Sequence, residues 1–173
     1  ALGYAISSRG GDYSNVYSSL EHRWSEEQAD REIGSRTAVD IRAHKGKGKL
    51  MKRAVLVNIV LDSLGLCKVP VLSMINTFDL KSEAELAGAL MGVPITAATL
   101  FSAGKRIASM ERSFNLRQTS NLEADTLPNM VFNQPDSNLS QTTLKEMINE
   151  FYEAMGWDQN GIPDPGELIM KGE

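Results

Sequence analysis

Apolar residues recur at helical spacing along most of this chain. The clearest case is the stretch 142–155, where six of them would share one face: Leu144, Met147, Ile148, Phe151, Tyr152 and Met155. Gly156 follows directly, and glycine is the residue that most often ends a helix. The spacing predicts an amphipathic helix over 142–155 with its apolar face in a core.

The stretch 49–61 (KLMKRAVLVNIVL) is apolar almost all round. Such a segment is typical of a buried helix. Its β-branched residues leave a strand as the alternative, but the run is longer than a usual buried strand. We therefore expect a buried helix here.

End signals predict two shorter helices. Ser25 is a candidate N-cap, and Gly34 is a candidate stop for a short polar helix. Ser82 and Glu85 have the spacing of a capping box, in which each side chain bonds the other residue's backbone amide. This box predicts a helix that runs to about Met91.

The longest predicted helix covers about 96–116. One of its sides would carry Leu100, Ala103, Ile107, Met110 and Phe114. Further on, Asp164, Pro165 and Glu167 have the residue types of a last helix N-terminus.

Two stretches favour irregular structure. The segment 1–19 is rich in Gly, Ser and Tyr, which is typical of loops. The segment 121–138 contains two prolines and reads as a crossing segment that packs through Val131 and Phe132. With no strand pattern and no repeat, the whole chain, 1–173, is predicted to be one all-α, multihelical domain of five or six helices with irregular connecting loops.

Composition and charge narrow the class of protein. Of the 173 residues, 42% are hydrophobic and 23% are charged, as in soluble globular proteins, and the net charge of −4 argues against nucleic acid or an anionic membrane as partner. The one basic run, 44–49, contains two glycines and is predicted to be a solvated connector, with an anion-binding domain as a minor alternative. No stretch is predicted to be a membrane span or a signal peptide, and the single cysteine favours a cytoplasmic location.

Catalytic residue types are scarce. The chain has two histidines and one cysteine, and it lacks the usual phosphate-binding and zinc-hydrolase motifs. A single Cys is most often buried in a core, but Cys67 closes the stretch DSLGLC directly after a predicted helix. Asp62 would lie in the last turn, where the helix dipole disfavours a carboxylate, so we expect it to have a specific partner. Gly65 is the predicted stop of that helix.

DSLGLC (62–67) resembles the DxxGLC motif of the tungsten-dependent aldehyde ferredoxin oxidoreductase family. Other stretches resemble the family in the same order: ALGYAISSRGG (1–11) its glycine-rich segment, MERSFNLR (110–117) and DTLP (125–128) its arginine-rich helix and following loop, and FYEAMGWDQNGIP (151–163) its closing helix and tail. Together they span nearly the whole chain.

The resemblance implies two cofactors in the full-length enzyme, a tungsten-bis-pterin and a four-iron, four-sulfur (4Fe-4S) cluster. It implies that Asp62, with the adjacent backbone at Gly65 and Leu66, binds one pterin, and that Cys67 ligates the cluster. Such a cluster needs four cysteines. The chain begins at Ala1 without Met, so we expect a carboxy-terminal fragment whose other cofactor-binding domains lie upstream and which binds no cluster by itself.

One position departs from the family pattern. Aligning RGG (9–11) places Asp12 and Tyr13 where aldehyde-oxidising relatives have a Cys-His pair. Asp12 and Tyr13 are therefore the catalytic candidates for acid-base chemistry. The resemblance implies oxidation of small aldehydes to carboxylates, with ferredoxin as partner and a homodimer as one assembly. An aryl-CoA reductase-type activity is the alternative within the family.

A non-catalytic helical interaction module is the alternative outside the family. The enzyme hypothesis predicts a concave face where 9–13 meets 62–67, with Cys67 near the surface, whereas the module hypothesis predicts a buried Cys67. Arg112 and Arg117 are predicted to be solvated or ion-paired. The aromatic residues Trp24, Trp157 and Tyr152 are predicted to be packing anchors.

Overall fold

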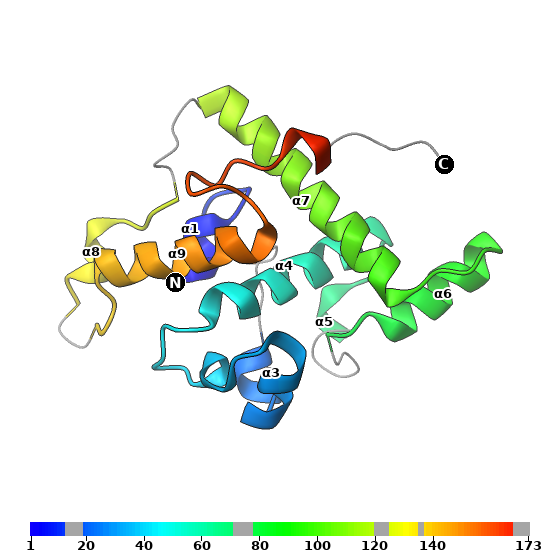
Figure 1. Cartoon of the computed structure of the whole chain (residues 1–173), viewed down its shortest axis with the longest axis horizontal. Helices are drawn as coiled ribbons and strands as arrows, with labels where there is room; N and C mark the ends of the chain where they lie inside the picture. Colours follow the sequence, from blue (N-terminus) through cyan, green and yellow to red (C-terminus); the bar gives the residue numbers. More distant parts are fainter. Residues whose placement is uncertain (13–18, 71–77, 120–124, 135–136, 168–173) are drawn as a thin grey trace.

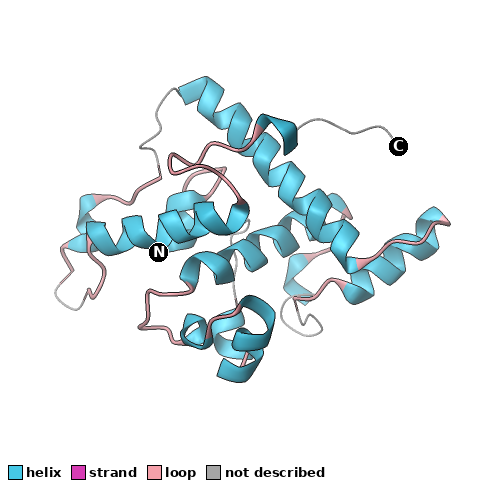
Figure 2. Ribbon diagram, viewed as in Figure 1, coloured by secondary structure: helices cyan, strands magenta, loops and turns pink. Residues whose placement is uncertain are grey.

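The computed structural model describes residues 1–12, 19–70, 78–119, 125–134 and 137–167 (Figure 1). Within these ranges all regular structure is helical and no strand occurs (Figure 2). The all-α prediction is therefore confirmed. Among the described helices, none is long and apolar enough to cross a membrane.

The longer described helices number five, which agrees with the predicted count. They are α3 (Glu26–Ile33), α4 (Lys47–Ser63), α6 (Lys81–Met91), α7 (Ala97–Thr119) and α9 (Gln141–Met155). The short elements are α1 (Leu2–Ile6), α2 (Leu20–Arg23), η1 (Arg36–Val39), α5 (Lys68–Pro70), α8 (Asn129–Phe132) and η3 (Pro165–Glu167).

Helix α4 is the centre of the molecule. It packs mainly against α9 and α7 and also contacts α1, η1 and α5 (Figure 1). Residues around its whole circumference are buried, as the apolar run 49–61 predicted. The helix is a buried support from which the other elements are positioned.

Two clusters of buried side chains lie on α4. The first contains Trp24, Val57 and Leu61 and joins α4 to α2, α3 and the start of α7. The second contains Ile59 and joins α4 to α1 and to the apolar face of α9. Met51 and Phe101 pack against both clusters, so the two are continuous.

The amphipathic helix α9 is confirmed residue by residue. All six predicted apolar residues are buried. Ser140 caps the N-terminus by accepting from the Thr143 amide at 3.0 Å, and Gly156 ends the helix at a φ of 74°. Helix α3 is confirmed in the same way by its Ser25 cap and its Gly34 stop at a φ of 66°.

The first segment is not wholly a loop. Residues 2–6 form α1, in which Leu2, Gly3 and Ala5 are buried. The Gly and Ser content predicted a loop, but packing of these few apolar residues against α4 and α9 stabilises a short helix.

The predicted capping box of α6 does not form. The helix begins at Lys81, and Leu80 takes the N-cap position at a φ of 59° without a side-chain cap. Both Phe78 and Leu80 are fully buried. Burial of these two side chains fixes where the chain enters the helix, and Ser82 is left inside the first turn.

The face that α7 buries agrees only in part with the predicted one, because Leu100 is buried and Ile107 packs against the second cluster. Leu100, Gly104 and Ala108 face the core, whereas Met110 is 51% exposed and Phe114 is 55% exposed. A Cβ on Gly104 would lie 3.2 Å from the Leu56 carbonyl oxygen. Small residues let α7 approach α4 closely, and this decides which face turns inward.

The basic run 44–49 is not a solvated connector. Helix α4 begins at Lys47, whose buried side chain pairs with Glu21 and donates to the Ala38 carbonyl at 2.9 Å. The amides of Gly46 and Gly48 donate to the Glu150 carboxylate at 3.0 and 2.9 Å. The anion at this helix N-terminus is therefore a side chain of α9.

The segment 121–138 is largely irregular in its described part, as predicted. It contains the one-turn helix α8, and Val131 and Phe132 pack against the second cluster as expected. Near the C-terminus, Asp164 Oδ1 accepts from the Gly166 amide at 2.8 Å, and η3 follows as a 3-10 turn.

Candidate functional site

The DSLGLC stretch forms the end of α4 and the turn after it. Gly65 adopts a φ of 69°, its amide donates to the Asp62 carbonyl at 3.1 Å, and the Leu66 amide donates to the Leu61 carbonyl at 2.9 Å. These two bonds are a Schellman motif, so Gly65 is the predicted stop. Leu66 packs against the first cluster and anchors the turn.

The carboxylate and the thiol of this stretch both face solvent. The Asp62 side chain is 51% exposed and pairs with the Lys68 ammonium at 2.7 Å, which is the specific partner expected for it. Cys67 is a free, exposed cysteine. The interaction-module hypothesis predicted a buried Cys67, and this prediction is wrong.

The donor atoms fit a shared cofactor site but do not complete one. Cys67 can supply one thiolate, and Asp62 can accept from ring N–H groups. Within the described part of the chain, no group of three or more His, Cys, Asp or Glu side chains is placed to hold a metal. The remaining cluster ligands would have to come from outside these residues.

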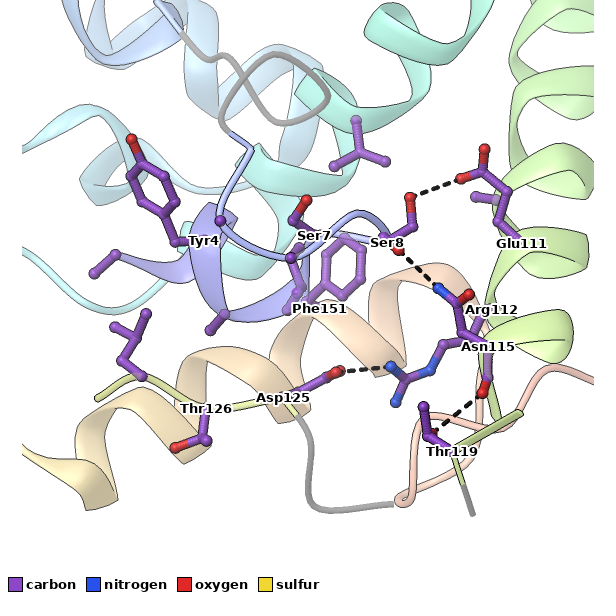
Figure 3. A pocket seen from close by; sticks show the side chains of 18 of the residues that line it. Tyr4, Ser7, Ser8, Glu111, Arg112, Asn115, Thr119, Asp125, Thr126 and Phe151 are labelled. Atoms are coloured by element: carbon purple, nitrogen blue, oxygen red, sulfur yellow. Dashed lines mark hydrogen bonds and ion pairs between the residues drawn. The ribbon is translucent and has the colours of Figure 1, made fainter. Parts of the chain in front are cut away.

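A large cavity lies beside the second cluster. Its volume is about 990 Å³, and its walls come from α1 and the following turn, α4, α7, the 125–128 segment, α8 and α9 (Figure 3). Much of the lining is apolar and includes Val55, Ile59, Leu127, Val131 and Phe151.

One wall of the cavity is polar. Glu111 of α7 accepts a hydrogen bond from the Ser8 hydroxyl at 3.0 Å, and Asn115, one turn further, donates to the Ser8 carbonyl at 2.8 Å (Figure 3). These two bonds hold the turn after α1 against α7. Gly10 and Gly11 of that turn line the cavity.

Arg112 joins three segments beside this wall. Its Nη1 pairs with Asp125 at 2.7 Å, its Nε donates to the Gly161 carbonyl at 3.0 Å, and its Nη2 donates to the Tyr152 hydroxyl at 3.1 Å. The guanidinium also lies over the rings of Tyr152 and Trp157. Arg112 is therefore ion-paired and structural, as predicted, and both aromatic residues are packing anchors.

Tyr152 completes the network. Its hydroxyl donates a short hydrogen bond to Asp125. Burial raises the pKa of Tyr152 well above its ordinary value, and the bond to the Asp125 carboxylate raises it further. The phenol therefore stays protonated in the folded chain.

The segments 9–13 and 62–67 were expected to meet at one concave face, but they do not both line this cavity. Gly10 and Gly11 line it, but none of the residues Asp62 to Cys67 does, and the α4 residue nearest to them in its lining is Ile59. The end of α4 that bears Asp62 leads toward α5 (Figure 1). Tyr13 of the segment 9–13 lies outside the described residues, so the shared concave face stays a prediction.

Of the two catalytic candidates, Asp12 and Tyr13, the structure describes only Asp12. The Asp12 carboxylate pairs with the Arg9 guanidinium at 2.8 Å at the end of the turn that lines the cavity. Tyr13 lies outside the described residues.

The sequence reading missed several polar residues of the cavity, above all Glu111, Asn115 and Asp125. The sequence signal for these residues is weak. Glu111 and Asn115 are four residues apart and so lie on one face of α7. Asp125 is brought to Arg112 by the tertiary fold, which the spacing does not predict.

Comparison with known proteins identifies the family of this chain. The family described as aldehyde ferredoxin oxidoreductase, domains 2 & 3, matches residues 1–170. Four of the stretches that resemble the family (1–11, 110–117, 125–128 and 151–163) contribute residues to the cavity lining, whereas 62–67 does not. No solved structure matches.

Curated relatives carry the name tungsten-containing aldehyde ferredoxin oxidoreductase. The protein from Pyrococcus horikoshii is 27% identical over 94% of this chain and 26% of its own length. The Pyrococcus furiosus protein is 32% identical over 59% of this chain and 17% of its own length. The chain thus spans about a quarter of the length of the relatives it matches. With a family match over nearly every residue, this chain belongs to the aldehyde ferredoxin oxidoreductase family.

Proposed function

We propose that this chain is the helical, carboxy-terminal part of a cytoplasmic tungsten-bis-pterin oxidoreductase that oxidises aldehydes to carboxylates. The observation that carries the proposal is the DSLGLC turn, which presents an exposed carboxylate and an exposed thiol from the rigid end of a buried helix. The relatives, named as tungsten-containing aldehyde ferredoxin oxidoreductases, support it.

In this proposal Asp62 accepts hydrogen bonds from the N–H groups of one pterin, with the backbone at Gly65 and Leu66 beside it. Cys67 supplies one thiolate to a 4Fe-4S cluster, and the other ligands come from the rest of the same polypeptide. By itself the chain binds no stable cluster. The Schellman turn supports these roles because it fixes the carboxylate and the thiol relative to each other.

The proposed reaction is balanced by water and an electron acceptor. An aldehyde and water give a carboxylate with the release of three protons and two electrons, and a ferredoxin-type iron-sulfur protein takes the electrons one at a time. Asp12 and Tyr13 are the proposed acid-base residues. The ion pair with the Arg9 guanidinium holds the Asp12 carboxylate in place. A homodimer is one proposed assembly.

The test replaces the thiol in the complete polypeptide that carries this chain. We expect Cys67→Ser to lower the iron content and the cluster's electron paramagnetic resonance signal severalfold, because serine is a poor ligand for such clusters. Asp62→Asn should reduce the pterin content instead. Ser63→Ala, at the neighbouring exposed position, is the matched control. Full cluster content in Cys67→Ser would disprove the assignment.

A further inference from the structure

Helix α6 carries apolar side chains on two of its sides. Ala84 and Ala87 are buried, and Ala84 belongs to the first cluster. On another side Leu86 and Leu90, one turn apart, face outward, and Leu90 is 79% exposed. A helix that is apolar on more than its core-facing side is normally covered by a second surface. The outward side of α6 therefore has the character of an interface.

Exposed apolar side chains continue past the end of the helix. Met91 is 66% exposed, and Val93 after it is 49% exposed. The stretch 86–104 contains no Asp, Glu, Lys or Arg, although 23% of the chain is charged. Exposed apolar surface of this kind is typical of contact sites. We define the α6 surface by its exposed apolar residues, which are Leu86, Ala89, Leu90, Met91 and Val93.

The charge pattern favours a protein partner over a lipid surface. Helices that lie on membranes carry several Lys and Arg residues on their polar face. Helix α6 has Lys81 as its one basic residue, and the Lys81 ammonium lies 3.5 Å from the Asp79 carboxylate. The helix packs mainly against α7 and lies at the edge of the molecule, where a second protein surface can reach it (Figure 1).

The length of the relatives and the position of α6 indicate which protein surface this is. The chain spans about a quarter of the relatives' length, so most of a polypeptide of that size lies outside it. Leu66 of the DSLGLC turn and Ala84 of α6 both pack in the first cluster. In the proposed function the remaining cluster ligands reach Cys67 from the rest of the polypeptide, which therefore has to approach this part of the molecule.

We propose that the α6 surface is an interface between this chain and the rest of the same polypeptide, which covers it with an apolar, uncharged face. Leu90, the most exposed of the defining residues, is the centre of the contact. The inference rests on the proposed function for the origin of the covering surface. A second copy of this chain and a lipid bilayer are the occupants that the test separates from it.

The test places a reporter of exposure at position 90. Leu90→Met nearly conserves side-chain volume, so a packed interface tolerates it, and a thioether is readily oxidised. Brief hydroxyl-radical labelling, read by tandem mass spectrometry, compares this chain with the complete polypeptide that carries it. Lys81→Met is the matched control, because it lies on the same helix at an exposed, charged position outside the α6 surface.

We expect position 90 to be labelled severalfold more slowly in the complete polypeptide than in this chain, because the partner surface covers it. Position 81 should be labelled at the same rate in both proteins. Met155 is fully buried and should be labelled slowly in both. Adding Leu86→Gln to the complete polypeptide should raise the labelling of position 90, because a polar side chain weakens an apolar contact.

Equal labelling of position 90 in the two proteins would overturn the inference, as would equal protection of position 81. Protection of position 90 in this chain that increases with chain concentration would overturn it in favour of a second copy. Protection that appears only with phosphatidylcholine and phosphatidylglycerol vesicles would overturn it in favour of a membrane.

The labelling and the Cys67→Ser experiment can fail separately. Protection of position 90 together with full cluster content in Cys67→Ser would reject the proposed role of Cys67 and keep the interface. Unprotected position 90 together with a depleted cluster in Cys67→Ser would reject the interface and keep the proposed function.

Discussion

Gly48 shows how a single residue limits the packing of α4 on α9. A Cβ at this position would lie 2.3 Å from the Phe151 amide nitrogen and 2.5 Å from the Glu150 carbonyl carbon, both backbone atoms. Alanine gains about 1 kcal/mol of helix propensity over glycine, but this overlap cannot be relieved without moving a helix.

We therefore expect Gly48→Ala to lower the free energy of unfolding by about 2 kcal/mol or more, as measured by urea denaturation. Gly11→Ala is the control because its added Cβ would meet nothing within 4 Å, and it should change stability by less than about 0.5 kcal/mol. A stabilised Gly48→Ala would show that α4 and α9 do not approach as closely as described.

Tyr152 gives the chain a pH dependence at high pH. Its pKa is raised in the folded chain, above the ordinary value of 10.0 that applies to the unfolded chain. The stability it contributes is therefore present in full below pH 10.0 and is lost as the pH rises toward the raised folded-state pKa. We expect the free energy of unfolding, measured by urea denaturation at a series of pH values, to fall as the pH rises above 10.0.

The matching variant is Tyr152→Phe. It removes the titrating group and leaves Asp125 without one hydrogen bond, so it should lose about 1–3 kcal/mol below pH 10.0 and show a weaker decline above it. A variant with the same decline as the parent chain would assign the pH dependence to other groups.

At the scale of elements, the sequence predicts helices well where periodicity and local end signals agree. Both ends of α9 and all six of its buried residues follow from the spacing and from Gly156. The stop at Gly65 is equally local, because a positive φ after a helix favours glycine wherever the helix packs.

Elements whose limits depend on tertiary contacts are predicted less well. The start of α6 is set by burial of Phe78 and Leu80, and the buried face of α7 by the close approach of Gly104 to α4. The candidate site divides in the same way. The DSLGLC turn is local and its stop at Gly65 was predicted. The ion pair of Arg112 with Asp125 in the cavity wall depends on tertiary contacts, and no rule of sequence spacing predicts it.

The N-terminus of α4 provides a prediction at this scale. Glu150 accepts from the amides of Gly46 and Gly48 and so caps one helix from another. Glu150→Ala should lower the free energy of unfolding by about 1–2 kcal/mol in urea denaturation, the usual effect of losing a helix cap. Glu150→Gln keeps an acceptor and should lose less. The exposed Glu153→Ala, one turn away from the cap, should be close to neutral.

The whole molecule has two clusters of buried side chains but one central helix. Since α4 supplies Leu61 to the first cluster and Ile59 to the second, and Met51 and Phe101 contact both, loss of one cluster should remove support from the other. We therefore expect a single cooperative unfolding transition.

Each cluster contains its own fluorescent reporter, Trp24 in the first and Trp157 against the second. Leu61→Ala and Met155→Ala remove fully buried side chains from the first and second clusters, and each should cost about 2–5 kcal/mol. Each variant is made in a Trp24→Phe background, where Trp157 reports unfolding, and in a Trp157→Phe background, where Trp24 reports it. The urea midpoint should shift by the same amount in both backgrounds. If Leu61→Ala moves only the Trp24 signal, the clusters unfold independently and α4 does not couple them. Equal shifts would show that α4 couples the two clusters into one cooperative unit, so that packing around Leu61 supports the cluster that contains Ile59.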